Sequence, residues 1–148
     1  MRFCSIASGS SGNCIYVGSE NTHVLVDTGI SGKKMEAGLN SLDLTGRDLD
    51  GILITHEHSD HIKGLGVISR KYGIPIYTTG GTVDAMVRTN ALGKIPGEIF
   101  HEIKEDESFE IGDLTVKPFS IPHDAAQPVG YRLECEGHSV GIATDLGK

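Results

Sequence analysis

The sequence predicts a layered α/β fold, in which β-sheets pack against helices. Short alternating strands occur towards both ends of the chain, helical patterns lie between them, and residues 51–55 (GILIT) form an apolar, β-branched run. A run of this kind is typical of a strand buried on both faces, so it requires one layer above it and another below it. With 148 residues, the chain is expected to form one domain over residues 1–148.

The first third of the chain is predicted to alternate between strands and turns. Strands are expected at residues 2–7, at 13–19 and within 22–29, and the Gly/Ser turn SGSSG separates the first two. Ser31 is predicted to cap a helix. The apolar residues of this helix recur at i, i+4 and i+7, as Met35, Leu39 and Leu42.

After the buried run, a helical pattern resumes and is stopped by Gly73 and Pro75. Its apolar residues are Ile62, Leu65, Ile68 and Tyr72. A short strand is expected at 75–79, and Thr82 is predicted to cap a further helix that ends at Gly93. From residue 95 onwards the pattern predicts hairpins, with turns at 112–113 and 136–137.

Composition argues against several classes of protein. The formal net charge of −7 opposes contact with a nucleic-acid backbone, although two divalent cations would add four charges and bring it to −3. The three cysteines form neither a CxxC motif nor an even framework, so we expect a reducing, cytoplasmic compartment. No secretory signal and no apolar run of membrane-spanning length is found, so no membrane association is expected.

Four potential metal ligands lie within six residues, directly after the buried run, in the segment ITHEHSDH. Residues i and i+2 of an extended chain point to the same side, so His56 and His58 are expected to converge on one ion. Asp60 and His61 lie at the start of the next helix and are expected to face an adjacent position. Glu57 and Ser59 would point elsewhere, and we assign them no metal role.

This spacing suits two neighbouring ions better than one. Imidazole and carboxylate groups bind zinc, manganese or iron without strong selection among them. A merely polar or pH-sensitive loop is the plainer interpretation, but four ligands in six residues argue against it. Further ligands are expected where other strands end, at His123 (SIPHDAA) and Asp145 (IATDLG). Taken separately, these two would be an ordinary loop histidine and a turn or cap residue.

The segment THEHSDH resembles the HxHxDH signature of the metallo-β-lactamase-fold hydrolases. VLVDTG, His123 and TDLG resemble the first, third and fourth motifs of that family, in the same order. SGSSGN, SIPHDAAQPVGYRLE and ATDLG further resemble its YycJ/WalJ branch, whose members are cytoplasmic, metal-dependent, nuclease-like phosphodiesterases. The resemblance implies an αββα sandwich built from two similar halves, of which this chain would form the N-terminal half to two-thirds.

The resemblance also implies a site for two divalent ions, with zinc expected and manganese or iron as alternatives. The first ion would be held by His56, His58 and His123, the second by Asp60 and His61, and Asp145 would bridge both. Asp27 would not bind metal and would form hydrogen bonds in the loops that support the site. SGSSGN would form a tight turn near the entrance, either offering N–H groups to an anion or serving only as a hairpin turn.

Two such ions, about 3.5–4 Å apart, lower the pKa of a shared water towards about 7. The metal-bridged hydroxide would attack phosphorus or a carbonyl carbon, and Asp60 would orient it as a catalytic residue. The leading hypothesis is a phosphodiesterase or exonuclease acting on DNA or RNA. The alternatives are a thioester or lactam hydrolase of the same fold, and a non-catalytic metal-binding fragment.

The sequence stops three residues after Asp145, whereas the family normally continues and supplies a last histidine to the second ion. We therefore expect a domain that is incomplete at its C-terminus, with a weakly occupied second metal site. We also expect exposed apolar faces and unpaired strand edges, and hence low stability unless another copy or a partner chain covers them.

Overall fold

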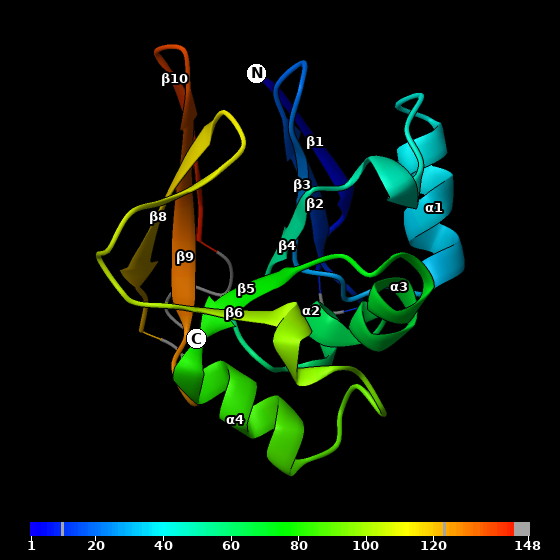
Figure 1. The fold of residues 1–148 in the computed structure, drawn as a ribbon, viewed down its shortest axis with the longest axis vertical. Coiled ribbons are helices and arrows are strands. Elements are labelled where there is room, and N and C mark those ends of the chain that lie inside the picture. Colours follow the sequence, from blue (N-terminus) through cyan, green and yellow to red (C-terminus); the bar gives the residue numbers. More distant parts are fainter. Residues whose placement is uncertain (10, 123, 144–148) are drawn as a thin grey trace.

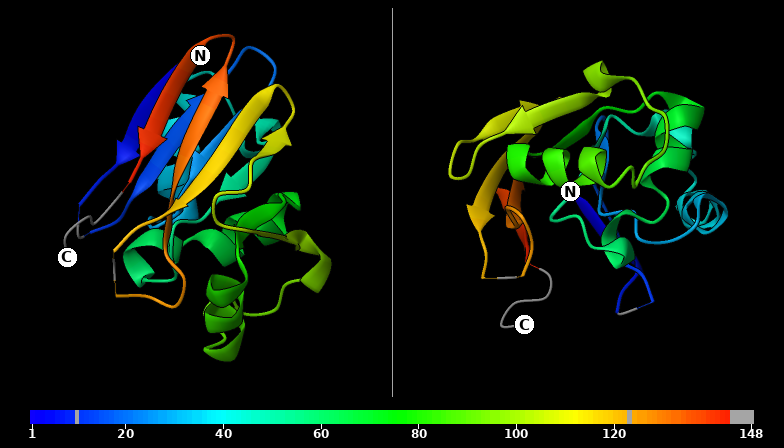
Figure 2. Two further views of the ribbon diagram at one scale, coloured as in Figure 1. Left: turned by 90° about the vertical axis from the view of Figure 1, so that its left-hand side faces the viewer. Right: turned by 90° about the horizontal axis from the view of Figure 1, so that it is seen from below.

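The computed structural model describes residues 1–148 except residues 10, 123 and 144–148. It contains two β-sheets packed face to face, with helices on the far side of the larger sheet (Figures 1 and 2). The six-stranded sheet has the order β1-β2-β3-β4-β5-β6, and the four-stranded sheet has the order β10-β9-β8-β7.

The larger sheet consists of β1 (Arg2–Ala7), β2 (Cys14–Gly18), β3 (His23–Val26), β4 (Gly51–Leu53), β5 (Ile76–Thr79) and β6 (Phe100–Ile103). The smaller sheet consists of β7 (Phe109–Ile111), β8 (Leu114–Ser120), β9 (Val129–Cys135) and β10 (His138–Ile142). The helices are α1 (Gly32–Asn40), α2 (Ser59–Ile62), α3 (Leu65–Tyr72) and α4 (Gly80–Arg88), with 3₁₀ turns η1 (Gly46–Asp48) and η2 (Gly97–Ile99). No helix in these described residues is long and apolar enough to cross a membrane.

Strand direction in the larger sheet decides where the polar residues meet. Strands β3, β4, β5 and β6 run parallel to one another, whereas β2 pairs antiparallel with both β1 and β3. The carboxyl ends of parallel strands lie at one edge of a sheet. Asp27 directly follows β3 and its backbone N–H donates to Leu53 at the end of β4, over 2.8 Å. Residues 54–58 therefore leave the sheet beside Asp27.

The central strands of the larger sheet are buried on both faces, as predicted for the run 51–55. Leu25, Ile52 and Ile76 belong to a cluster that also contains residues of α1 and α3. The opposite face contributes Val26 and Leu53 to a second cluster, shared with strands of the smaller sheet. Burial on both sides explains why this segment of the sequence is uniformly apolar.

The smaller sheet is amphipathic rather than apolar on both faces. In β9, Tyr131 and Leu133 are buried while Arg132 and Glu134 between them are exposed. Among the described residues no helix covers this outer face, and no large exposed hydrophobic residue lies on this sheet. The outward positions of this sheet are therefore polar, while the expectation of exposed apolar faces and unpaired strand edges in an incomplete domain stays a prediction.

Several element boundaries differ from the prediction. The expected single helix at 62–72 is two helices, because the N–H of Gly64 donates to Thr28 over 2.8 Å and so leaves the helical pattern. Thr79, not Thr82, caps α4, and its side chain accepts from the Thr82 N–H. Strand β6 pairs in parallel with β5 instead of opening a hairpin. The cap at Ser31 and both predicted hairpin turns are confirmed.

Candidate metal centre

Three histidine rings gather where the buried strand β4 ends. His56 and His61 are fully buried, and their ring centroids lie 4.0 Å apart. The ring of His58, which is partly buried, lies 4.8 Å from that of His56 in an edge-on arrangement. The i, i+2 spacing of the sequence therefore does bring His56 and His58 together, and α2 returns His61 to the same place.

Helix α2 positions the remaining described ligand candidate. His58 is its N-cap, in an extended backbone conformation, and Asp60 lies in its first turn. The carboxylate Oδ2 of Asp60 is 3.5 Å from Nε2 of His61, and the Asp60 side chain is 27% exposed. Asp60 is thus a carboxylate at the rim of the cluster, within reach of a bound molecule.

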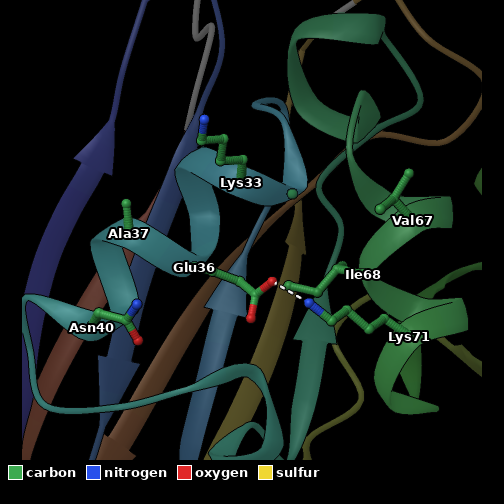
Figure 3. A pocket seen from close by; sticks show the side chains of 8 residues that line it. Lys33, Glu36, Ala37, Asn40, Val67, Ile68 and Lys71 are labelled. Atoms are coloured by element: carbon green, nitrogen blue, oxygen red, sulfur yellow. Dashed lines mark hydrogen bonds and ion pairs between the residues drawn. The ribbon is translucent and has the colours of Figure 1, made fainter.

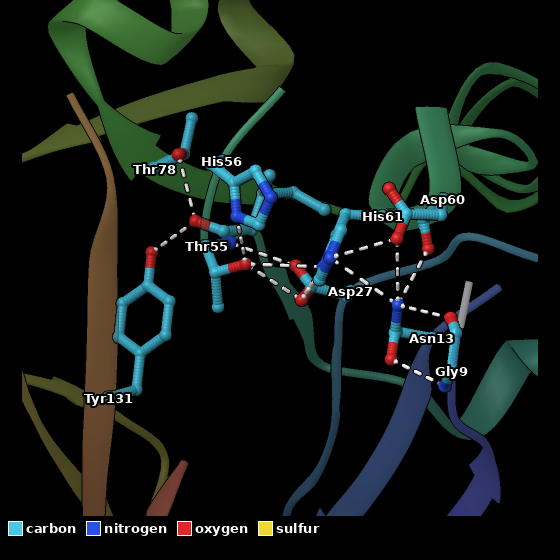
Figure 4. Close-up of polar contacts among 10 residues, drawn as sticks. Gly9, Asn13, Asp27, Thr55, His56, Asp60, His61, Thr78 and Tyr131 are labelled. Carbon is cyan, nitrogen blue, oxygen red and sulfur yellow. Dashed lines mark hydrogen bonds and ion pairs between the residues drawn. The ribbon is translucent and has the colours of Figure 1, made fainter. Parts of the chain in front are cut away.

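Asp27 supports this cluster from beneath, as Figure 4 shows. Its buried carboxylate accepts hydrogen bonds from the backbone N–H and the hydroxyl of Thr55, both over 2.8 Å. It also lies 2.6 Å from Nδ1 of His61. Burial raises the pKa of the Asp27 carboxyl, and the hydrogen bonds from His61 and Thr55 oppose that rise. These contacts match the supporting role expected from the sequence.

The same hydrogen bonds indicate which ring nitrogen carries the proton in each buried histidine. Because Asp27 accepts from Nδ1 of His61, that ring carries its lone pair on Nε2. The Thr55 hydroxyl donates to Asp27, so its oxygen accepts from Nδ1 of His56 over 3.0 Å. Both rings are therefore set in the neutral tautomer that binds metal through Nε2.

The spacing of these donor atoms fits a divalent ion. Bonds from zinc to imidazole nitrogen and carboxylate oxygen are each about 2.0–2.2 Å long. Two such bonds span at most about 4.4 Å, and the 3.5 Å between Asp60 Oδ2 and His61 Nε2 lies within that limit. Asp60 and His61 can therefore reach one ion together, while His56 and His58 stand beside them.

The described residues alone do not form a complete ligand set. Within them, no three His, Cys, Asp or Glu side chains form a group that could hold a metal ion. Two of the six predicted ligands, His123 and Asp145, lie outside the described residues. Their assignment, like the division of ligands between two ions, stays a prediction.

Sequence reasoning missed the connection between the cluster and the β8–β9 segment. The backbone N–H of Ala126 donates to the Glu57 carboxylate over 3.1 Å, and Val129 N–H donates to the Thr55 oxygen over 3.0 Å. Gln127 accepts from the Gly81 N–H over 2.8 Å at the start of α4. Glu57, to which we assigned no metal role, thus binds the backbone of another part of the chain. The sequence signal that could have indicated a role for Glu57 was its position inside the motif HEHSDH.

Asn13 is the second residue that the sequence did not single out. Its side chain contacts both Asp60 and His61, from the end of the SGSSGN turn. The motif was interpreted as a turn because of its glycines and serines, so the side-chain amide of its last residue was overlooked.

A hollow of about 590 Å³ lies elsewhere, on the helical side of the molecule. Figure 3 shows its lining from α1 and α3, with an ion pair between Glu36 and Lys71 at 2.7 Å. None of the predicted site residues lines it, so it is separate from the histidine cluster.

Comparison with known proteins identifies the family of the chain. The family model described as "Beta-lactamase superfamily domain" matches residues 22–148. The chain is 42% identical to an exodeoxyribonuclease YycJ of Bacillus anthracis, over 99% of this chain and 55% of the relative. It is 40% identical to an exodeoxyribonuclease WalJ of Streptococcus pneumoniae, over 99% of this chain and 54% of the relative. The chain thus spans about half the length of these relatives.

Among solved structures, a metallo-β-lactamase of Cronobacter sakazakii with an HARLDQ motif superimposes with a TM-score of 0.77. It is 17% identical and covers 91% of this chain and 58% of its own, a likeness that shows the fold alone. The predicted fold class and the resemblance to the YycJ/WalJ branch are confirmed. The chain belongs to the β-lactamase superfamily domain family.

Proposed function

We propose that this chain carries most of the metal-binding residues of a divalent-metal-dependent phosphodiesterase that acts on DNA. The observation that carries the proposal is the cluster at the end of β4, where Asp27 and Thr55 fix both buried imidazoles in the metal-binding tautomer. Three imidazoles and a carboxylate within one turn have no structural need to be together. DNA is favoured over RNA because the relatives are named exodeoxyribonucleases.

The proposed ligand assignment follows the sequence prediction. His56, His58 and His123 would hold one ion, Asp60 and His61 a second, and Asp145 would lie between them. The bonds from Ala126 to Glu57 and from Val129 to Thr55 support including His123, because they join its segment to the cluster. Zinc fits the donor set, and manganese or iron are the alternatives.

The chemistry that such ions supply is the activation of water near neutral pH and the stabilisation of negative charge on a phosphate. The chain's own residues provide the surroundings. Asp27 keeps the His61 ring in place, and Asp60, at the rim, orients the attacking water and faces the substrate. The formal charge of −7 disfavours a nucleic-acid backbone, and two divalent ions offset four of those charges where the phosphate binds.

The compartment we propose is the cytoplasm. Cys4, Cys14 and Cys135 are all free thiols, which fits a reducing environment.

The function is tested by measuring hydrolysis of bis-p-nitrophenyl phosphate and of end-labelled DNA, with added Zn²⁺ or Mn²⁺. His58→Ala should reduce turnover by about 100-fold or more, since losing a supporting residue of a metal site already costs 10–100-fold. His138→Ala, an exposed histidine at the start of β10, is the matched control and should leave turnover unchanged. Equal activity in both variants would point to a contaminant and refute the assignment.

The same preparation separates the alternative functions. A chromogenic lactam and a thioester serve as competing substrates, and preferential turnover of either would replace the phosphodiesterase assignment. Binding of metal without hydrolysis of any substrate would instead support a non-catalytic role.

A further inference from the structure

A groove lies between helices α1 and α3, on the outer side of the larger sheet. Its main hollow, of about 590 Å³, is lined by residues of both helices (Figure 3). A second hollow of about 330 Å³ extends to Thr45 and Arg47, beyond the C-terminus of α1. The two hollows share Glu36 and Lys71 in their linings, so we treat them as one groove, the α1–α3 groove.

One end of the α1–α3 groove lies towards the histidine cluster. The N–H of Thr28 donates to the His61 carbonyl over 2.7 Å, and the Thr28 carbonyl accepts from the Gly64 N–H over 2.8 Å. These bonds join the segments that enter α1, at Gly32, and α3, at Leu65, to the segment that carries the ligand candidates. Both helices therefore begin beside the candidate metal centre.

The two helices run in the same direction away from that point. A Cβ on Gly32 would lie 3.2 Å from Cγ1 of Val67, so the helices approach each other closely near their starts. One turn further along each helix, Glu36 pairs with Lys71 over 2.7 Å. The groove between them consequently leads from the metal centre towards Arg47.

The lining of the groove carries more positive than negative charge. Its cations are Lys33, Lys71 and Arg47, and the single carboxylate among the residues of both linings is Glu36. Lys71 donates to that carboxylate over 2.7 Å, and the Tyr72 hydroxyl donates to its other oxygen. Both bonds lower the pKa of Glu36, so its negative charge is kept and is matched by Lys71. Lys33 and Arg47, both exposed, supply the remaining positive charge.

Helices α1 to α3 differ in charge from the smaller sheet. Residues 104–142, the part of the sequence that contains the smaller sheet, carry three Lys or Arg and eight Asp or Glu. Residues 32–40 and 59–72 carry two Asp or Glu and five exposed cations, Lys33, Lys34, Lys63, Arg70 and Lys71. Figure 2 shows the helices and the smaller sheet on opposite sides of the larger sheet. A polyanion is therefore attracted to the helical side, despite the net charge of −7.

The shape of the groove suits one strand of nucleic acid. Packed helices lie about 8–10 Å apart, which is too narrow for a duplex to enter between them. Beside the cations the groove offers apolar surface, because Val67 is 53% exposed and Ala37 is exposed as well. A single strand can place its phosphates on the cations and its unpaired bases on this surface, whereas the bases of a duplex are stacked inside it.

We propose that the α1–α3 groove binds the phosphate backbone of a single DNA strand, next to the candidate metal centre. Lys33 would contact the phosphates closest to the centre, and Arg47 those further along the strand. The inference rests on the proposed function for its choice of DNA, and it names the surface that holds the strand outside the reaction site. An anionic membrane or an acidic protein would be attracted by the same cations, but neither accounts for a groove that begins at the metal centre.

The test measures binding of a fluorescein-labelled single-stranded oligonucleotide to the whole chain by fluorescence anisotropy, in EDTA at low salt. The chelator prevents hydrolysis and removes any contribution from bound metal. Lys33→Ala and Arg47→Ala should each weaken binding by about 3–10-fold, because each removes one phosphate contact. Each should also reduce the slope of log affinity against log salt by about 0.7, the value for one contact on a single strand.

Lys117→Ala is the matched control. Lys117 is an exposed cation of β8 in the smaller sheet, so this variant loses the same charge on the acidic side of the molecule. Its affinity should stay within about twofold of the wild type, and its salt slope should be unchanged. All three substitutions replace exposed side chains, and circular dichroism checks that each variant is folded.

Competition identifies the ligand. Unlabelled single-stranded DNA should displace the probe at lower concentrations than duplex DNA, poly-glutamate or phosphatidylserine vesicles. Equal or better displacement by any of these three competitors would overturn the assignment to a single strand.

The inference is also overturned if Lys33→Ala and Arg47→Ala bind the oligonucleotide as tightly as Lys117→Ala, or if the wild type does not bind it. Neither result bears on the metal-dependent hydrolysis assigned to the histidine cluster, which is measured separately. Conversely, a chain that binds the strand through Lys33 and Arg47 but hydrolyses no phosphodiester would support this inference and remove the proposed function.

Discussion

Replacing Asp27 with Asn is expected to reverse the tautomer of His61. The carboxylate now accepts from Nδ1 of His61 over 2.6 Å and from the backbone N–H and hydroxyl of Thr55 over 2.8 Å. In Asp27→Asn the amide oxygen can keep the Thr55 N–H, which leaves the NH₂ group facing Nδ1. That nitrogen must then accept, so the proton moves to Nε2 and points towards Asp60, where an ion should bind.

The size of the effect follows from these contacts. Loss of an orienting carboxylate behind a metal-binding histidine costs about 10–100-fold in metal affinity, and this variant also blocks the ligand atom, so we expect the upper end. Stability should change less. Hydrogen bonds to a charged group contribute about 1.5–3 kcal/mol each. The neutral amide, however, removes the cost of burying a charge, the cost that raises the pKa of Asp27.

Two measurements check this reasoning. Long-range ¹⁵N NMR reports which ring nitrogen of His61 is protonated in the ion-free protein, and metal titration gives the affinities. Asp50→Asn is the matched control, because that carboxylate accepts the His23 N–H over 2.9 Å just before β4, at its other end. An unchanged His61 tautomer together with wild-type affinity in Asp27→Asn would refute the supporting role of this carboxylate.

Three further substitutions test other parts of the structure. Gly29→Ala should cost at least about 1–3 kcal/mol in urea unfolding, because its Cβ would lie 1.7 Å from a backbone oxygen of α2; an unchanged midpoint would contradict that packing. Tyr131→Phe should cost about 0.5–1.5 kcal/mol by losing the 2.7 Å bond from its hydroxyl to the Ile54 oxygen, and a stabilised variant would argue against that bond. Glu36→Gln should lower the melting temperature modestly at neutral pH, since hydrogen bonding to Lys71 lowers the pKa of Glu36 in the folded chain. That stabilisation is complete above the ordinary value of 4.5 and is lost as the pH falls through the lowered folded-state pKa, so the difference from wild type should vanish in acid.

The parts of the fold that could be predicted are those set by local pattern. The run 51–55 indicated a strand buried on both faces, and β4 is buried throughout. The turns at 112–113 and 136–137 carry glycine, and both are confirmed as hairpins. The boundary between α2 and α3 could not be predicted, because it depends on a bond from Gly64 to Thr28, a residue 36 positions earlier.

The residues of the candidate site likewise divide into those that the local sequence pattern predicted and those that it did not. His56, His58 and His61 are close in sequence, so their spacing alone indicated that they would meet. Asn13 and Glu57 were missed, because their partners lie 47 and 69 positions away and no periodicity reports such distances. In the sequence, an amide at the end of a Gly/Ser turn is naturally interpreted as part of that turn. Only the structure reveals that α2 packs against it.

Topology supplies what the sequence pattern lacks. Parallel pairing of β3 with β4 brings Asp27 next to Thr55, which lies 28 positions later in the sequence, so no local signal reports that this carboxylate lies beneath the histidines. The smaller sheet is fastened to the same point, because Tyr131 and Val129 of β9 bond to the oxygens of Ile54 and Thr55. The start of β9 therefore lies beside the end of β4. The two sheets are thus joined directly beside the histidine cluster, which is where we expect ligands contributed by the second sheet to meet those of the first.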